Sequence, residues 1–215
     1  MGQRAQAEVR GGRRLVIWRH GETDHNAQGI WQGHLDTALS ATGRAQAAAA
    51  AAALSAYEPS VILSSDLRRA AETAQALAAV VDGAVRYDAR LREIHVGQWE
   101  GMSAGDVAAQ FPADQEALTR GEDLPRGVDG ETVAQVVTRG RAAFEELLDL
   151  LGDGECAVVA THGVTGRALA ASLVGLDQHR AWLSLGGLLN AHWAELREGR
   201  LGWRITAWNV GAGVR

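Results

Sequence analysis

The sequence predicts an α/β fold, a three-layer sandwich in which helices cover both faces of a mostly parallel central sheet. Short apolar runs typical of buried strands alternate along the chain with helical segments of ten or more residues, and this alternation favours parallel strands joined by crossover helices. Two of the apolar runs, 15–18 and 157–160, are each followed by one polar residue, then a histidine and a glycine. Ligands of open α/β sheets gather outside the carboxyl ends of the strands, so we expect both histidines to face a crevice.

Composition limits the class of protein. The 215 residues suffice for one sizeable core, and the hydrophobic fraction of 47% and charged fraction of 22% are close to globular averages. We expect a single domain over 13–215 after a flexible segment at 1–12, which lacks the apolar centre of a signal peptide. No apolar stretch approaches the length of a membrane span, so a cytoplasmic protein without membrane contact is expected. The 21 basic residues are all arginine and face 26 acids, and a net charge of −5 argues against a nucleic-acid partner.

The first half of the chain is expected to alternate strand and helix. After the strand at 15–18, residues 40–56 are rich in alanine and begin near the helix caps Ser40 and Thr42, which predicts a scaffold helix packed closely on the sheet. The other elements expected in this half are a buried strand at 60–63, a helix at 66–81, an edge strand at 84–87 and a loop at 91–101.

The second half begins with a segment around 100–130 that is expected to form a small cap or flap over the sheet. Ser103 and Asp106 have capping-box spacing at the start of a short helix over 103–110, and the polar stretch 111–130 that follows carries prolines and glycines. The elements expected after it are a helix at 132–151, a strand at 156–161, a helix at 164–174, and strands at 190–196 and 203–208 joined as a hairpin through 197–200. Cys156 is the only cysteine, which excludes an internal disulfide and suits a small buried residue.

Residues that could bind phosphate or take part in catalysis lie at four predicted strand ends. They are Arg19 and His20, then Arg68 or Arg69, then Glu93, then His162. A phosphomonoester carries about −1.5 to −2 charges at neutral pH, and its oxygens match the guanidinium fork. Neutral imidazole is a nucleophile near pH 7, because its ordinary pKa is about 6.5 and neighbouring cations disfavour protonation. We therefore expect a pocket for phosphoryl transfer in which His20 attacks.

Two other uses of these residues compete with that hypothesis. His20, His95, His162 and Glu93 are all possible zinc ligands, although metal hydrolases usually show tighter spacing, such as two histidines one helical turn apart. A non-catalytic pocket that binds phosphorylated metabolites without turnover is the second alternative. The hypothesis we favour needs neither a metal nor another cofactor.

The same residues belong to an ordered series of short motifs. The series is Arg19-His20-Gly21-Glu22-Thr23 with Asn26, Gln32-Gly33 with Asp36, Leu39-Ser40 with Gly43, Ser64-Ser65-Asp66-Leu67 with Arg69-Ala70 and Thr73-Ala74, Leu91 with Glu93, Gly97 with Trp99-Glu100-Gly101, and Thr161-His162-Gly163. It resembles the histidine phosphatase superfamily, in its phosphoglycerate mutase-like branch, over most of the chain. The chain departs from that pattern at Ala38, where the family often has proline.

The resemblance implies a role for each matching residue. By it His20 becomes phosphohistidine and Glu93 protonates the leaving oxygen. Arg69 is selected over Arg68, since Arg69 directly precedes Ala70 in the motif. The residues implied to hold the transferring group are Arg19, Arg69 and His162, and those implied to bind substrate are Asn26, Gln32, Gly33 and Gly163.

For residues near the motifs the sequence gives less specific predictions. His95 is expected in a structural or rim position, and Trp31 and Trp99 are equal candidates for lining a substrate pocket. The remaining histidines, expected at the surface or in packing contacts, are His25, His34, His179 and His192.

Sequence also bears on which reaction follows the first half-reaction, which phosphatases and mutases share. The segment 111–130 is short and contains no lysine, which removes one usual partner of a second phosphate or carboxylate and favours a phosphatase over the alternative, a cofactor-dependent phosphoglycerate mutase. The substrate is expected to be a small phosphorylated metabolite. Segments at 64–70, 185–190 and 203–209 resemble family members that act on a sugar phosphoglycerate, and the resemblance together with the terminal hairpin is compatible with a homodimer.

Overall fold

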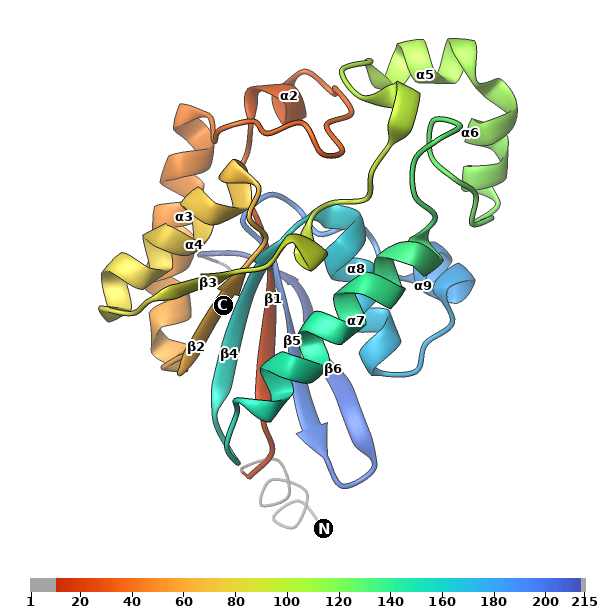
Figure 1. The fold of residues 1–215 in the computed structure, drawn as a ribbon. Coiled ribbons are helices and arrows are strands. Elements are labelled where there is room, and N and C mark those ends of the chain that lie inside the picture. Colours follow the sequence, from red (N-terminus) through yellow and green to blue (C-terminus); the bar gives the residue numbers. More distant parts are fainter. Residues whose placement is uncertain (1–10, 214–215) are drawn as a thin grey trace.

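A computed structural model describes residues 11–213 of the chain, so residues 1–10 of the segment expected to be flexible lie outside the described residues. Its strands form one six-stranded sheet in the order β3-β2-β4-β1-β5-β6 (Figure 1). Strands β3, β2, β4 and β1 are parallel to one another, whereas β5 runs antiparallel to both β1 and β6. The strands are β1 Arg14–Arg19, β2 Val61–Ser64, β3 Val85–Tyr87, β4 Cys156–Thr161, β5 Trp193–Gly199 and β6 Gly202–Val210. The predicted α/β class with a mostly parallel sheet is confirmed.

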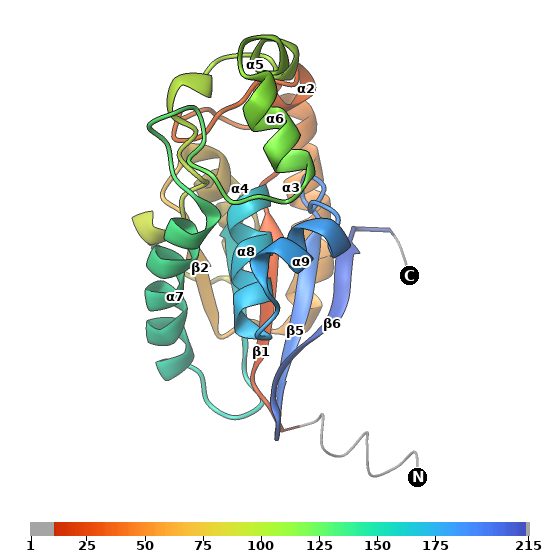
Figure 2. The ribbon, with the colours of Figure 1, turned by 90° about the vertical axis from the view of Figure 1, so that its right-hand side faces the viewer.

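Helices cover both faces of this sheet, as Figures 1 and 2 show. Alternate residues of β1 face opposite layers: Leu15 and Ile17 pack in the cluster with α7 and α8, while Val16 and Trp18 pack in the cluster with α3 and α4. This is the two-residue period of a strand buried on both sides. The helices of these layers are α3 Ala41–Leu54, α4 Arg68–Val81, α7 Val133–Asp149 and α8 Gly163–Leu173, with the shorter α9 Gln178–Ser184 after α8.

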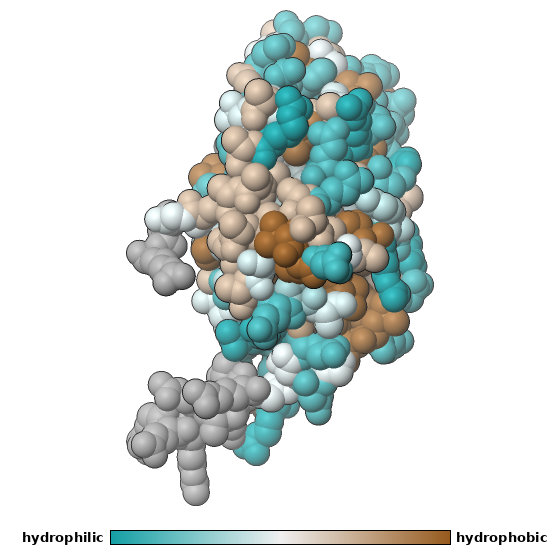
Figure 3. All heavy atoms as spheres, turned by 90° about the vertical axis from the view of Figure 1, so that its left-hand side faces the viewer, coloured by the Kyte–Doolittle hydropathy of each residue, from teal (hydrophilic) through white to brown (hydrophobic). Residues whose placement is uncertain are grey.

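Helix α3 packs closely because its inner face is made of small residues. Ser40 caps its first turn by accepting from the Gly43 amide at 3.0 Å. A Cβ on Gly43 would lie 1.9 Å from the Glu22 carbonyl oxygen, and one on Gly21 would lie 2.4 Å from the Gly43 carbonyl oxygen. These two glycines therefore let the helix touch the segment that leaves β1. The outward alanines give this side of the molecule its pale brown area in Figure 3.

A cap of short helices lies above the carboxyl edge of the sheet (Figure 1). It has its own buried cluster, which includes Ile94, Trp99 and Leu118. Part of the stretch 111–130 is helical, because Pro112 starts a helix at a position where its missing N–H costs nothing. The helices of this region are α2 Asp24–Ala27, α5 Ala104–Gln110 and α6 Pro112–Thr119, with the single 3₁₀ turn η3 Gly97–Trp99. Two further 3₁₀ turns, η1 Ser55–Tyr57 and η2 Ala89–Leu91, lie elsewhere in the chain.

The strands of the carboxyl-terminal hairpin differ from their predicted bounds. Strand β5 begins at Trp193 rather than at 190 and continues to Gly199, so the turn shrinks to Arg200 and Leu201. The start is delayed because Ala191 adopts a positive φ of 57° and its amide donates to the His20 carbonyl at 3.0 Å instead of joining the sheet. Over residues 11–213 no helix is long and apolar enough to cross a membrane.

Candidate active site

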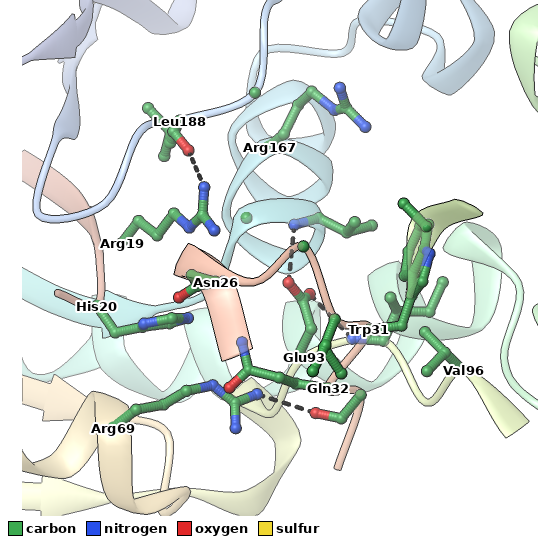
Figure 4. Close-up of a pocket in the computed structure, with 18 residues that line it drawn as sticks. Arg19, His20, Asn26, Trp31, Gln32, Arg69, Glu93, Val96, Arg167 and Leu188 are labelled. Atoms are coloured by element: carbon green, nitrogen blue, oxygen red, sulfur yellow. Dashed lines mark hydrogen bonds between the residues drawn. The ribbon is translucent and has the colours of Figure 1, made fainter. Parts of the chain in front are cut away.

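The two histidines that follow strands meet because their strands are neighbours. Strands β1 and β4 pair in parallel with Arg19 opposite Thr161, so His20 and His162 leave the sheet side by side with ring centroids 5.1 Å apart. The His20 amide continues the ladder by donating to the Thr161 carbonyl at 2.9 Å. The crevice expected at the carboxyl edge is a cavity of about 310 Å³ at this point (Figure 4).

Eight of the nine predicted site residues line this cavity. They are Arg19, His20, Asn26, Gln32, Gly33, Arg69, Glu93 and Gly163. His162, the ninth, is fully buried and is not among the lining residues, and its ring centroid lies 5.1 Å from that of His20.

The hydrogen bond of His20 determines which ring nitrogen is free to react. Nδ1 lies 2.7 Å from the Gly21 carbonyl oxygen, which can only accept, so Nδ1 carries the proton. Burial, and then the charges of Arg69 and Arg19, hold the pKa of His20 well below its usual 6.5. The ring is therefore neutral near pH 7, and the Nε2 lone pair is available to a substrate.

Two buried guanidinium groups flank that histidine, each held by backbone carbonyls. Arg19 donates through Nη1 to the Leu188 carbonyl at 2.6 Å, and Arg69 donates to the Leu35 and Gly33 carbonyls at 2.7 and 2.9 Å. Burial lowers the pKa of both, that of Arg69 to about 10. In both residues Nε is buried without a hydrogen-bond partner. The site thus holds two positive charges, and no carboxylate within residues 11–213 forms an ion pair with either arginine.

His162 is oriented by a serine at the end of β2. Its Nε2 lies 2.9 Å from Ser65 Oγ, which also accepts from the Leu67 amide at 3.3 Å. Nδ1 is buried without a partner. Burial, followed by the charge of Arg69 and contact with His20, holds the pKa of His162 well below its usual value.

Glu93 lies across the cavity at the start of helix α8. Oε1 accepts from the amides of Ile94 and Thr165 at 3.0 and 3.1 Å and from the Thr165 hydroxyl at 3.2 Å. Oε2 accepts from the Val164 amide at 3.2 Å and faces the Gly163 side of the cavity. Backbone donors at a helix N-terminus therefore hold this carboxyl at a fixed place (Figure 4).

The two predicted amide ligands are fixed through their carbonyl ends. Asn26 Oδ1 accepts from the Thr23 amide at 3.2 Å, completing the capping box of α2, and from Asn190 Nδ2 at 3.1 Å. Gln32 Oε1 accepts from the Thr37 hydroxyl at 2.5 Å. In both side chains the NH₂ end is the part offered to a ligand.

The two predicted glycines differ in how well they would accept a side chain, since only Gly33 is both crowded and at a positive φ. Gly33 has a φ of 51°, and an added Cβ would lie 2.5 Å from Glu100 Oε1 and 2.8 Å from Val96 Cγ2. A Cβ on Gly163 would meet the Arg19 guanidinium carbon at 3.6 Å and so would narrow the cavity. These residues leave room for groups that the cavity holds.

The structure also places the neighbours about which the sequence was less specific. Trp31 lines the cavity, whereas Trp99 is fully buried beneath it with its ring centroid 5.4 Å from that of Trp31. Arg68 points away from the site and pairs with Glu72 at 2.7 Å, its side chain 62% exposed. His95 is not among the lining residues, and its Nε2 lies 3.7 Å from Glu100 Oε1.

Some residues at the site were not foreseen from the sequence. His34, expected only at the surface or in packing, bonds through Nε2 to the Glu93 carbonyl at 2.8 Å. Arg167 and Leu188 line the cavity, and no motif marked either residue. Arg167 lies one helical turn after Gly163 on α8, and that spacing is the only signal by which sequence reasoning would have found it. No group of three or more potential metal ligands is gathered within residues 11–213.

Comparisons with known proteins agree with this geometry. The family model described as Histidine phosphatase superfamily (branch 1) matches residues 15–211. Glucosyl-3-phosphoglycerate phosphatases of Mycolicibacterium vanbaalenii and Mycobacterium tuberculosis are 40% and 39% identical, and in each case the match covers 94% of this chain and 96% of the relative. A solved structure of mycobacterial glucosyl-3-phosphoglycerate phosphatase in complex with VO3 has a TM-score of 0.86 at 40% identity, covering 93% of this chain and all of that one.

The fold and the site define an α/β enzyme of phosphoryl chemistry, a hydrolase of phosphoric monoesters. The chain belongs to the histidine phosphatase superfamily, branch 1.

Proposed function

We propose that this phosphatase hydrolyses glucosyl-3-phosphoglycerate through a phosphohistidine formed on His20. The observation that carries the proposal is the orientation of that ring: a proton fixed on Nδ1 by the Gly21 carbonyl, a depressed pKa, and a free Nε2 between Arg19 and Arg69. A buried neutral imidazole flanked by two cations is suited to attack a dianionic phosphoryl group.

In the first step His20 Nε2 attacks phosphorus, and the bond from phosphorus to the ester oxygen breaks. The ester oxygen takes a proton from the Glu93 carboxyl and departs as an alcohol. Arg19 and Arg69 stabilise the charge on the three equatorial oxygens. They do so through the guanidinium N–H groups that are not bonded to backbone carbonyls of other residues. His162 donates from Nδ1 to one of the same oxygens, since its other nitrogen is held by Ser65.

In the second step water replaces the alcohol. Glu93, now a carboxylate, takes a proton from the water as its oxygen attacks phosphorus, and the bond from phosphorus to Nε2 breaks. Inorganic phosphate and the neutral His20 are released. The NH₂ groups of Asn26 and Gln32 orient the substrate, and no metal ion takes part in either step.

The choice of substrate rests on two observations. The chain is similar to glucosyl-3-phosphoglycerate phosphatases over nearly its full length, and the segment 185–190 forms part of the cavity wall. In that segment Leu188 accepts from Arg19, and Asn190 donates to both the His20 carbonyl and Asn26. The segment thus joins the groups that hold phosphate to those that orient the ester. It is one of the parts in which the chain resembles phosphatases of sugar phosphoglycerates.

The experiment measures phosphate release, with chelator present, from glucosyl-3-phosphoglycerate, 3-phosphoglycerate and p-nitrophenyl phosphate. A strong preference for the glucosyl ester is expected, whereas equal slow release from all three would replace it by a generalist phosphatase. Interconversion of phosphoglycerates without net phosphate release would make the chain a mutase. Binding without turnover would leave only a sensor of phosphorylated metabolites.

The nucleophile is tested in the same assay. His20→Ala should abolish turnover and the trapping of acid-labile, base-stable phosphoenzyme from labelled substrate. His25→Ala is the matched control, because His25 lies on α2 and does not line the cavity. Turnover that survives the loss of His20 would remove it as the nucleophile.

We further propose a cytoplasmic homodimer. The cytoplasm is where phosphorylated metabolites of this charge are formed and retained. For the dimer, β6 is an edge strand with an unpaired side, and Leu201 at the hairpin turn is 94% exposed. Light scattering on the purified full chain measures the oligomeric state, and a monomer at micromolar concentration would contradict the dimer.

A further inference from the structure

A second cavity, of about 360 Å³, adjoins the one that holds His20. Val164 and Arg167 line both cavities, so the two spaces share a wall on the outer side of α8. The second space lies between α8, α9 and the segment that leads from the cap into α7. Its other lining residues are Gly121, Glu122, Asp123, Arg126, Val133, Ala168, Asp177, Gln178, His179 and Trp182.

Arg167 is held in the shared wall without a carboxylate partner. Its guanidinium carbon lies 4.0 Å from the centroid of the Trp182 ring, and its one protein hydrogen bond is a long contact of 3.5 Å from Nη1 to the Leu185 carbonyl. None of the ion pairs formed within 4.0 Å by residues 11–213 includes Arg167. Burial lowers its pKa. A stacked, partly buried guanidinium with unused donors is suited to a planar anion.

A second buried cation adds to the positive potential of this space. Arg126 is 2% exposed, and its guanidinium carbon lies 5.8 Å from the centroid of the same Trp182 ring. Asp123 approaches it only to 3.9 Å, because the Asp123 carboxylate is occupied by the amides of Val133 and Ala134 at 2.7 and 2.9 Å, where it caps α7. The other two acids of the lining are also engaged, since Glu122 pairs with Arg120 at 2.6 Å and Asp177 accepts from the Arg180 amide at 3.1 Å. The guanidinium groups are therefore the charges of this cavity without a close partner, which suits an anionic ligand.

The position of Arg167 relative to the proposed acid shows which part of a substrate it meets. The Val164 amide donates to Glu93 Oε2, and Arg167 lies three residues further along α8, on the neighbouring position of the same helix face. The opposite charge of Glu93 is the largest influence that raises the pKa of Arg167, which agrees with their proximity. Glu93 protonates the leaving oxygen in the proposed reaction, so Arg167 is on the leaving-group side of the cavity (Figure 4).

We propose that Arg167 binds a carboxylate of the leaving group and that the second cavity receives the part of the leaving group beyond it. This rests on the proposed function only in so far as the phosphoryl group occupies the cavity beside His20. Arg167 is then a specificity-determining residue, and the preferred substrates are phosphomonoesters whose alcohol carries a carboxylate close to the ester oxygen. Arg126 contributes its charge without direct contact.

The test compares two substrates that differ at a single group. In 3-phosphoglycerate a carboxylate stands where glycerol 3-phosphate has a hydroxymethyl group. Arg167→Met should lower the ratio of kcat/KM values, carboxylated over uncarboxylated, by at least tenfold, mainly through KM. Arg167→Lys should keep part of the ratio, because it retains the charge but loses the planar fork. Arg180→Met is the matched control, since Arg180 is exposed on α9 and lines neither cavity.

The outcomes separate this proposal from the proposed function. Equal losses on both substrates in Arg167→Met, or a wild-type protein without preference for the carboxylate, would overturn the role of Arg167 while leaving the phosphatase intact. Absence of phosphate release from every ester would instead overturn the proposed function. Thermal-shift titration with the same two compounds then measures the discrimination without turnover, and equal shifts in wild type and variant would overturn the subsite as well.

Discussion

Replacement of Arg69 by methionine separates the effect of this buried cation on the stability of the fold from its effect on activity. The guanidinium is 1% exposed, and burial lowers its pKa to about 10 from the usual 12.5. A shift of that size corresponds to about 3 kcal/mol of unfavourable free energy for the charged form in the folded protein. The hydrogen bonds to the Leu35 and Gly33 carbonyls offset this, since each bond from a charged donor contributes about 1.5 to 3 kcal/mol.

The free energy of unfolding of Arg69→Met should therefore fall by no more than about 3 kcal/mol, because the two lost hydrogen bonds total about 3 to 6 kcal/mol and the relieved desolvation returns about 3. Activity should behave differently. Loss of even one charged donor to the phosphoryl oxygens removes about 1.5 to 3 kcal/mol of transition-state stabilisation, which is about a 10- to 150-fold decrease in kcat/KM. The assay is p-nitrophenyl phosphate hydrolysis, accompanied by urea unfolding of the same samples.

Arg68→Met provides the control at the adjacent position of the same helix. Arg68 is exposed and its pairing with Glu72 is a surface salt bridge, so both kcat/KM and stability should remain close to wild type. The reasoning is refuted if Arg69→Met keeps its activity, or if Arg68→Met loses as much. Loss of activity that merely follows unfolding would show that Arg69 holds the loop at 33–35 rather than the substrate.

Two further predictions concern the acid and the buried histidines. Glu93→Gln should slow esters of poorly acidic alcohols far more than p-nitrophenyl phosphate, whose leaving group scarcely needs a proton; equal losses measured on both esters would show that Glu93 is not the acid. The second concerns stability against pH. His162 has a folded pKa well below the value of about 6.5 expected when unfolded, so the unfolded chain gains a proton first, and stability falls as pH drops below about 6.5, by up to about 1.4 kcal/mol per pH unit. His162→Gln should make the pH dependence of urea unfolding between pH 6.5 and 5 shallower by that amount, and an unaltered slope would indicate an ordinary histidine.

The sequence was most informative where chemistry and strand ends coincide. Arg19 and His20 follow an apolar run whose burial could be predicted, and the parallel pairing of β1 with β4 brings His162 beside them. What could not be predicted was how far each group lies from the cavity surface. His162, which is expected to hold the transferring group, is fully buried, and its Nε2 lies 2.9 Å from Ser65 Oγ just after the end of β2.

Sequence reasoning failed where tertiary contacts override local pattern. Alternation continues through 190–196, but the His20 carbonyl binds the Ala191 amide and delays the strand to Trp193. The only sequence signal for Arg167 is its position one turn after Gly163, and that signal is weak because a single arginine on a helix is ordinarily a solvated side chain. Arg167 is partly kept out of solvent by Trp182, which belongs to α9 and stacks against its guanidinium group.

The buried polar atoms that lack partners reveal how the site is prepared for its ligand. Within residues 11–213 they are few, and three of them surround His20: Arg19 Nε, Arg69 Nε and His162 Nδ1. A buried donor without an acceptor costs about 1 to 3 kcal/mol, so a fold that retains three at one place must gain from them elsewhere. The two arginine atoms are donors, as is His162 Nδ1 in the tautomer that the proposed reaction uses, and a phosphoryl group offers only acceptors. The unmet donors in the free protein are thus satisfied most fully when negative charge is greatest on the phosphoryl oxygens, which is the condition for stabilising the transition state more than the ground state.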